Sequence, residues 1–179
     1  MNMINYRQQR GASMVEIVVT IVIVAIALLG LASMQANAMS YLKIANLRSE
    51  AVQSAYDISD RMRANSAAIK AGGVNPNYYS YTASYASKGG TMPTVPTCAI
   101  AGSCTAQEIA NIDLAEWQRG LSSRLISGGG YVVPNAVNGY DVTVMWKELS
   151  LTTADANCPN AGVTAPGVGV RCFTVRFTP

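Results

Sequence analysis

The sequence predicts an α+β fold, with one long N-terminal helix packed against a C-terminal antiparallel sheet, one additional helix and two disulfides. Three observations predict it. Residues 17–69 contain no proline and carry first an apolar run and then a helical pattern. A capping box at Thr105 marks the start of a second helix. Strand-like alternation and a hairpin signal occur within residues 131–177.

Composition excludes several classes of function. The 179 residues suffice for one domain plus an extra segment, and half of them are hydrophobic, so the chain is not globally disordered. It has no histidine, the commonest general base and metal ligand. The net charge of +3 comes from scattered basic residues, which does not indicate a nucleic-acid groove. Asp113 and Glu116 share a helix face and form a conceivable catalytic pair, but a solvated helix edge is the favoured interpretation. We therefore expect no enzyme, no cofactor, no metal and no nucleic-acid partner.

The N-terminal segment combines a polar leader with a membrane-length apolar run. The leader contains Arg7 and Arg10 and no acid, and no charged residue occurs in residues 17–42. A helix needs about 20 mostly apolar residues to cross a bilayer, and residues 17–35 approach that length. The positive charges before the run favour a cytoplasmic N-terminus.

Three interpretations of this segment compete. A secretory signal peptide would use Ala36-Asn37-Ala38 as its cleavage site, although the apolar run is longer than most signal sequences and begins beside Glu16. A plain single-pass anchor explains the length of the run but not Glu16, because an acid at the membrane edge is costly without a partner. The third interpretation is that the helix is kept and that Glu16 has a function.

The residues Gly11-Ala12-Ser13-Met14-Val15-Glu16, followed by the apolar helix, resemble the prepilin leader of type IV pilins and pseudopilins. The resemblance implies a type IV pilin fold and processing by a prepilin peptidase/methyltransferase. The enzyme would cut between Gly11 and Ala12 and methylate Ala12, where the family usually has phenylalanine. Glu16, the fifth mature residue, would neutralise the terminal amine of a neighbouring subunit. A carboxylate among packed apolar helices needs such a cation.

The helix is expected to continue beyond the apolar run to about residue 71. Apolar and small residues recur at intervals of three and four and predict one packing face: Met39, Leu42, Ala45, Ser49, Val52, Tyr56, Ser59, Met62, Ser66 and Ile69. Gly72-Gly73 then provides a stop signal. The expected organisation is a cleaved leader (1–11), an apolar transmembrane and assembly half (12–35), an amphipathic half (36–71) and a globular periplasmic head (72–179).

Within the head, a tyrosine-rich loop over residues 71–103 precedes the second helix. Thr105 and Glu108 form the capping box. One apolar face is predicted for the helix that follows, and the glycines at 128–130 end it. The residues of that face are Ile109, Ile112, Trp117, Leu121 and Leu125. Trp117 is expected in the core.

A hairpin and a last strand complete the predicted sheet. Residues 131–133 are followed by Asn138-Gly139, a strong hairpin signal. Residues 140–147 then alternate as in a half-buried strand. In the last strand, residues 168–177, Phe173, Val175 and Phe177 share one face, and Cys172 points to the other.

Four cysteines without a neighbouring histidine indicate two disulfides and hence an oxidising compartment. Three pairings are possible. The local one, Cys98–Cys104 and Cys158–Cys172, is preferred because each loop that it closes is short and rich in turn residues.

Scattered positions also resemble the minor type IV pilins of the PilV subfamily, namely residues 28–35, 113–117 and 142–146. The resemblance implies that other minor pilins, the major pilin and a large tip adhesin are partners. It further implies a subunit that starts in the inner membrane, primes pilus assembly and ends near the extracellular tip, where it supports twitching motility and adhesion. The alternative is a minor pseudopilin of a type II secretion system.

Overall fold

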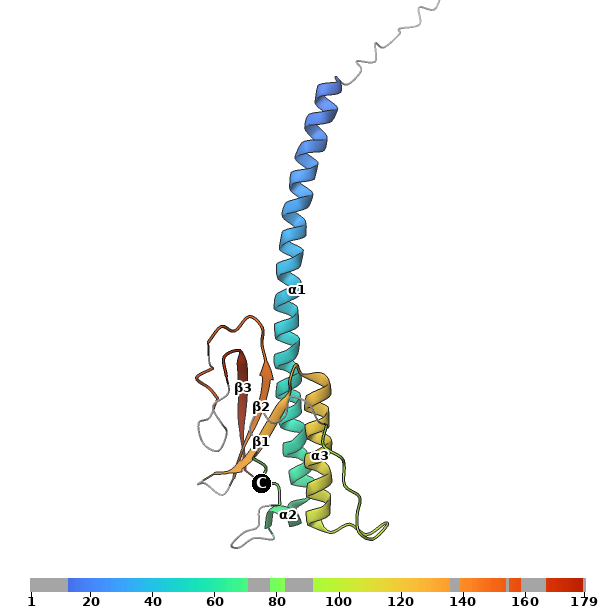
Figure 1. Ribbon diagram of the computed structural model, residues 1–179, viewed down its shortest axis with the longest axis vertical. Coiled ribbons are helices and arrows are strands. Elements are labelled where there is room, and N and C mark those ends of the chain that lie inside the picture. Colours follow the sequence, from blue (N-terminus) through green and yellow to red (C-terminus); the bar gives the residue numbers. More distant parts are fainter. Residues whose placement is uncertain are drawn as a thin grey trace, which may run out of the picture. The chain divides into compact units, whose positions relative to one another are not determined.

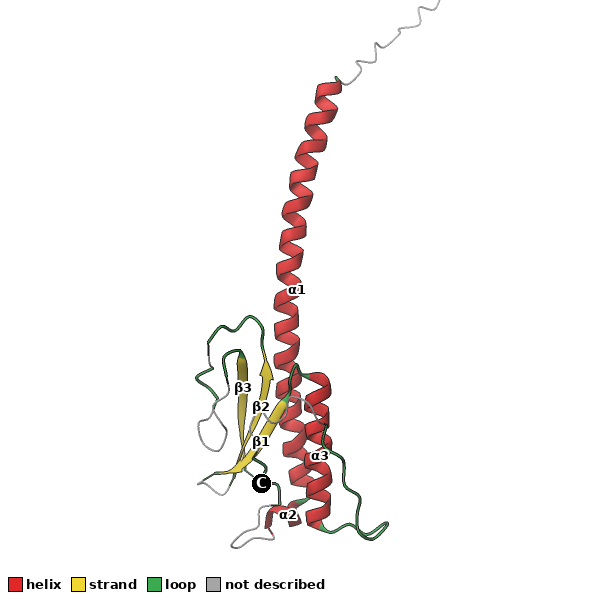
Figure 2. Ribbon diagram, viewed as in Figure 1, coloured by secondary structure: helices red, strands yellow, loops and turns green. Residues whose placement is uncertain are grey.

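The computed structural model describes residues 13–70, 78–82, 92–135, 139–153, 155–158 and 167–178. In chain order the elements are α1 (Met14–Ala64), α2 (Ser66–Lys70), α3 (Ala106–Arg124), β1 (Gly129–Pro134), β2 (Tyr140–Lys147) and β3 (Val170–Phe177) (Figures 1 and 2). The three strands form one antiparallel sheet in the order β1-β2-β3. The predicted α+β class, with its long N-terminal helix and two disulfides, is confirmed. Contacts divide the chain into two compact units, one up to Lys43 and one from Ile44 onward.

The first unit is the apolar part of α1. Within this helix an 18-residue window has a mean hydropathy of 2.9, and none of that window is buried. The helix is therefore long and apolar enough to cross a membrane. Its large apolar side chains are exposed in every direction, from Met14 at 87% to Ile17 at 49%. A helix that is apolar all round requires burial in lipid or among other apolar helices.

The second unit begins with the remainder of α1, which α3 accompanies in the opposite direction (Figure 1). The antiparallel course follows from the contacts. Near the start of this unit Glu50 pairs with Arg124 at the end of α3. At the other end, the Asn65 amide donates to the carbonyl of Ala106, the first residue of α3.

The prediction of one uninterrupted helix to about residue 71 is wrong at Asn65, where α1 ends and the short α2 begins one residue later. The side chain of Asn65 is buried. Its side-chain amide donates to the Ala106 carbonyl (2.9 Å) and to the Tyr79 hydroxyl (3.2 Å). Asparagine has modest helix propensity and readily exchanges helical geometry for side-chain hydrogen bonds. These two tertiary contacts therefore account for the break.

The buried face of α1 differs in part from the predicted packing face. Of the predicted stripe within this unit, Ser59 and Met62 are buried, whereas Tyr56 is 52% exposed. The buried face is made largely of small residues: Ala51, Ser54, Ala55, Ile58, Ser59 and Met62. Small side chains let a neighbouring helix and a sheet approach closely, which places this face in the core. The indole of Trp117 on α3 donates to the Ser54 carbonyl at 2.8 Å across this contact.

Helix α3 begins as predicted but packs through a rotated face. The Thr105 side chain accepts from the Glu108 amide, and the Glu108 carboxylate accepts from the Thr105 amide, so the capping box is confirmed. Trp117 is 1% exposed and belongs to the core, as expected. Ile109 is 37% exposed, contrary to prediction, because a different face of α3 is buried. The buried residues of the helix are Ala110, Leu114, Trp117, Gln118 and Leu121. The polar Gln118 is accommodated because its amide donates to the Gly130 carbonyl at 3.0 Å.

The hairpin of β1 and β2 is confirmed by its antiparallel register, in which Pro134 lies opposite Tyr140. Residue 138 of the Asn-Gly signal lies outside the described residues. Gly129 and Gly130, expected to end the helix, are instead the first residues of β1, because α3 already ends at Arg124. The last strand begins at Val170, two residues later than predicted.

The prediction that β2 is half-buried is wrong, because both faces of the strand are covered. On one face Tyr140, Val142, Val144 and Trp146 join the main core with α1, α3 and Phe177. On the other face Met145 belongs to a second, smaller cluster with Tyr131, Val170 and the disulfide-bonded cysteines Cys158 and Cys172. The segment that carries Cys158 thus covers a surface that alternation alone predicts to be solvated.

Close packing between β1 and α3 leads to a prediction at Gly130. A Cβ atom at this position would lie 2.5 Å from Trp117 Cη2 and 2.9 Å from the Thr143 carbonyl oxygen. We expect Gly130→Ala to destabilise the protein by about 1–3 kcal/mol, the usual cost of overpacking. The measurement is chemical unfolding of the full chain in detergent micelles. Gly167→Ala is the matched control, because nothing lies within 4 Å of a Cβ atom there. Equal stability of the two variants would contradict the prediction.

Candidate assembly site

Glu16 lies in the first turn of α1, and its backbone amide donates to the Ser13 carbonyl at 2.9 Å. Its neighbours Met14, Val15 and Ile17 are apolar and exposed. Within the described residues no ion pair reaches the Glu16 carboxylate, in contrast to the acids Glu50, Asp57 and Asp60 farther along the helix. Gly11 and Ala12, the predicted processing residues, lie outside the described residues.

A carboxylate at the start of an all-round apolar helix has a clear chemical requirement. When such a helix is buried among other apolar helices, the charge loses its hydration and needs a cation at hydrogen-bonding distance. The surface that accompanies Glu16 is made mainly of valine, isoleucine and leucine side chains, which favour contact with lipid or with like helices. The segment is therefore suited to contact with lipid or with like helices, and its single carboxylate needs a cation in either setting.

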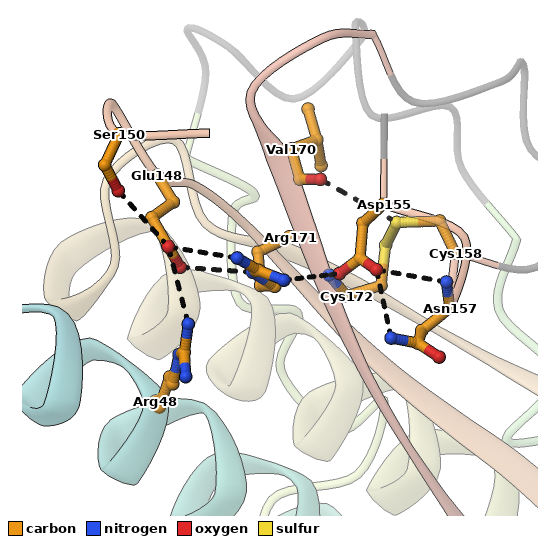
Figure 3. Close-up of polar contacts among 9 residues, drawn as sticks. All are labelled: Arg48, Glu148, Ser150, Asp155, Asn157, Cys158, Val170, Arg171 and Cys172. Carbon is orange, nitrogen blue, oxygen red and sulfur yellow. Dashed lines mark hydrogen bonds and ion pairs between the residues drawn. A yellow bond between two sulfur atoms is a disulfide. The ribbon is translucent and has the colours of Figure 1, made fainter. Parts of the chain in front are cut away.

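In the head, a buried carboxylate joins α1 to the sheet. Glu148, just after β2, is 4% exposed. It accepts two hydrogen bonds from the Arg171 guanidinium on β3, at 3.2 and 3.1 Å, and one from Arg48 on α1 at 3.5 Å (Figure 3). The hydroxyl of Ser150 donates to the same carboxylate at 3.3 Å. This group, Arg48, Glu148, Ser150 and Arg171, is termed the Glu148 cluster.

The charges around Glu148 set its protonation state. Burial alone would raise the pKa of this carboxyl, but the hydrogen bonds and charge of Arg171, with the charge of Arg48, outweigh that effect and hold the pKa below its usual range. The pKa of Arg171 is correspondingly raised, chiefly by its hydrogen bonds to Glu148. Glu148 and Arg171 are thus both charged at neutral pH.

The Glu148 cluster continues to the disulfide between Cys158 and Cys172 through Asp155. One carboxylate oxygen of Asp155 lies 3.6 Å from the Arg171 guanidinium and accepts from the Cys172 backbone amide at 3.2 Å (Figure 3). The other accepts from the backbone and side-chain amides of Asn157. Burial would raise the pKa of Asp155, but these hydrogen bonds and Arg171 lower it overall.

A second polar cluster lies between α1 and α3 and includes the two carboxylates considered as a catalytic pair. Arg61 donates to Asp113 at 3.3 Å and to Glu116 at 2.7 Å, and also pairs with Asp57. The Tyr79 hydroxyl donates to Asp113 at 2.6 Å. Burial and this hydrogen bond raise the pKa of Tyr79, so the hydroxyl keeps its proton. Asp113 and Glu116 therefore bridge two helices through Arg61.

The two disulfides, Cys98–Cys104 and Cys158–Cys172, correspond to the pairing preferred from the sequence. In the part of the chain that the structure describes, no group of three or more histidine, cysteine, aspartate or glutamate side chains is placed to hold a metal ion. Glu148 and Arg171 could not be predicted as site residues, because a single charge in or just after a strand gives no sign of burial. The one local signal is the position of Arg171 next to Cys172, in a strand that also contains Thr174 and Arg176.

Comparison with known families places these features in context. A family model described as type IV pilin Tt1218 matches residues 33–115, and a model of the prokaryotic N-terminal methylation motif matches residues 6–32. The two matches adjoin, and the second contains Gly11, Ala12 and Glu16. They do not single out the PilV subfamily. No match was found among curated proteins or among solved structures. Together with these two matches, the long apolar helix and the antiparallel sheet support a type IV pilin, and type IV pilins are structural proteins.

Proposed function

We propose that the protein is a minor type IV pilin that joins other minor pilins in a complex that primes pilus assembly. The observation that carries the proposal is Glu16, an acid without a partner within the described residues, at the start of an all-round apolar helix. A prepilin peptidase/methyltransferase cuts between Gly11 and Ala12 and methylates Ala12. The processed subunit resides in the inner membrane with its head in the periplasm and is then incorporated into the fibre.

The position within the fibre follows from the same charge. A subunit that ends the fibre has no neighbour ahead of it whose amine needs neutralising, so it has no use for the acid. Because this chain has Glu16, another subunit lies ahead of it. The protein is therefore located near the tip but is not the terminal subunit. It supports pilus biogenesis, twitching motility and adhesion, with the major pilin and a large tip adhesin among its partners.

The intact mass and N-terminal residue of the protein, purified from membranes of its native host, test the processing step. We expect a chain that starts at methylated Ala12. A chain that starts at Met39, after the Ala36-Asn37-Ala38 sequence, would show an ordinary signal peptide and overturn the assembly proposal. An uncut N-terminus would overturn it as well, because a plain anchor needs no processing.

A minor pseudopilin of a type II secretion system is the second candidate, because it would share the leader, the apolar helix and Glu16. Deletion of the gene separates the two functions. Loss of twitching with normal protein secretion supports the pilus, and loss of secretion with normal twitching supports the secretion system. The same Ala12 terminus is expected in both cases, so this experiment is independent of the mass measurement.

A further inference from the structure

The two disulfides differ sharply in their surroundings. Cys158 and Cys172 are 7% and 6% exposed and lie in the second apolar cluster, where they pack with Tyr131, Met145 and Val170. Cys104, in contrast, is exposed, and Cys98 is half-buried. A thiol must reach a sulfur atom in order to exchange with a disulfide. The Cys98–Cys104 bond is thus open to reagents that the other bond excludes.

The exposed disulfide closes a small loop that is attached to the start of α3 by one residue. Glu108 uses one carboxylate oxygen to accept from the Ala99 amide, inside the loop, at 2.7 Å. Its other oxygen accepts from the Thr105 amide at 2.8 Å and from the Thr105 hydroxyl at 2.9 Å. The same side chain therefore holds the disulfide loop and completes the cap of the helix.

The first turn of α3 also contacts Asn65, the residue between α1 and α2. The Ala106 carbonyl accepts a hydrogen bond from the side-chain amide of Asn65, which also donates to the Tyr79 hydroxyl. A continuous set of contacts therefore connects the Cys98–Cys104 loop, Glu108, the first turn of α3 and the end of α1. The Glu148 cluster and the buried disulfide take no part in it.

We propose that Cys98–Cys104 is a selectively reducible bond that controls the order of the first turn of α3, with dithiols as the class of reagent that acts on it. In the reaction one thiol of the dithiol attacks a protein sulfur and the S–S bond breaks. The second thiol then attacks the resulting mixed disulfide, which releases the protein sulfur and leaves the reagent oxidised to its own disulfide. The two protons of the dithiol, one from each thiol, end on Cys98 and Cys104. Opening the loop frees Ala99 to move away from Glu108, which weakens the cap. The sheet and the main core stay folded, because Cys158–Cys172 is intact.

The test uses the full chain in detergent micelles, treated with dithiothreitol without denaturant. Alkylation followed by mass spectrometry is expected to label Cys98 and Cys104 at least about tenfold faster than Cys158 and Cys172, which need an opening of the fold. Hydrogen exchange is expected to show several-fold loss of protection at the amides of Glu108 and Ile109, which bind Thr105, with residues of β2 unchanged. Labelling of all four cysteines at one rate would overturn the proposal, as would unchanged exchange after selective reduction.

A double variant, Cys98→Ser with Cys104→Ser, separates the loss of the bond from side effects of the reagent. Its oxidised form is expected to show the fast exchange at Glu108 and Ile109 already, with no further change on adding dithiothreitol. If this variant instead keeps the slow exchange of the oxidised wild type, the disulfide does not control the helix start and the proposal fails.

Discussion

Replacing Glu16 with alanine is expected to prevent the protein from entering the fibre while leaving the head folded. The carboxylate has no ion-pair partner within the described residues, so its removal costs the isolated chain little. In the assembly it would leave the terminal amine of a neighbour unpaired among apolar helices, at a cost of about 3 kcal/mol or more. We therefore expect at least about a hundredfold less protein in sheared fibres, measured by immunoblotting against the amount in membranes.

Thr20→Ala is the matched control for this prediction. Thr20 lies one turn farther along the same helix, and its hydroxyl donates to the Ile17 carbonyl at 2.8 Å within the helix. The variant removes a polar group but no charge, so normal incorporation is expected. Glu16→Gln keeps the hydrogen-bonding capacity and loses the charge, and it should fail like the alanine variant. Normal incorporation of Glu16→Ala would show that amine pairing is not what Glu16 provides.

Glu148→Gln is expected to destabilise the head by about 3 kcal/mol, the lower end of the range for breaking a buried ion pair. The amide has nearly the same shape but leaves two guanidinium groups, Arg171 and Arg48, without their carboxylate. Arg48 is half exposed and can return to water, which keeps the cost at the lower end. The measurement is the free energy of unfolding by denaturant, for the full chain in micelles at neutral pH.

The lowered pKa values of Glu148 and Asp155 predict how the stability of the protein changes with pH. Both carboxyls have a lower pKa in the folded protein than in the unfolded chain. In acid the unfolded chain therefore binds more protons, so the stability from these groups is present at neutral pH and is lost progressively as the pH falls below about 5. Glu148→Gln should show a smaller loss of stability between neutral pH and pH 3 than the wild type.

An exposed ion pair provides the control for Glu148. Arg63 and Asp60 lie 2.7 Å apart, closer than Arg171 and Glu148, but their side chains are 58% and 71% exposed. Asp60→Asn is expected to change the stability by less than about 1 kcal/mol. A result in which Asp60→Asn costs as much as Glu148→Gln would show that burial does not set the strength of the Glu148 cluster.

The sequence predicts what depends on local pattern. The apolar helix, the capping box of Thr105 and Glu108 and the hairpin each depend on residues within a few positions of one another, and the structure contains all three. The start of α1 with Glu16 was found in the same way. The processing at Gly11 and Ala12 came from resemblance to a family and stays a prediction.

The features that sequence analysis missed depend on contacts between distant segments. The buried face of α1 is made of alanine and serine, which carry little hydrophobic signal, so the larger but exposed Tyr56 was placed on it instead. The break at Asn65 is set by Ala106 and Tyr79, neither of which is near it in the sequence. Periodicity reports the geometry of one element and cannot report which other element covers it.

The long sequence separation between α1 and the sheet has a consequence for how the chain matures during synthesis. Arg48 and Glu148 are 100 residues apart, and Phe177 of β3 lies in the same core as Ala51 of α1. Translation delivers α1 first and β3 after the other described elements. Contacts of this range form slowly, because a large loop must close before any of them contributes. The apolar helix is therefore synthesised well before the main core can form, and the alanine and serine face of α1 lacks its partners until the last strand has been made.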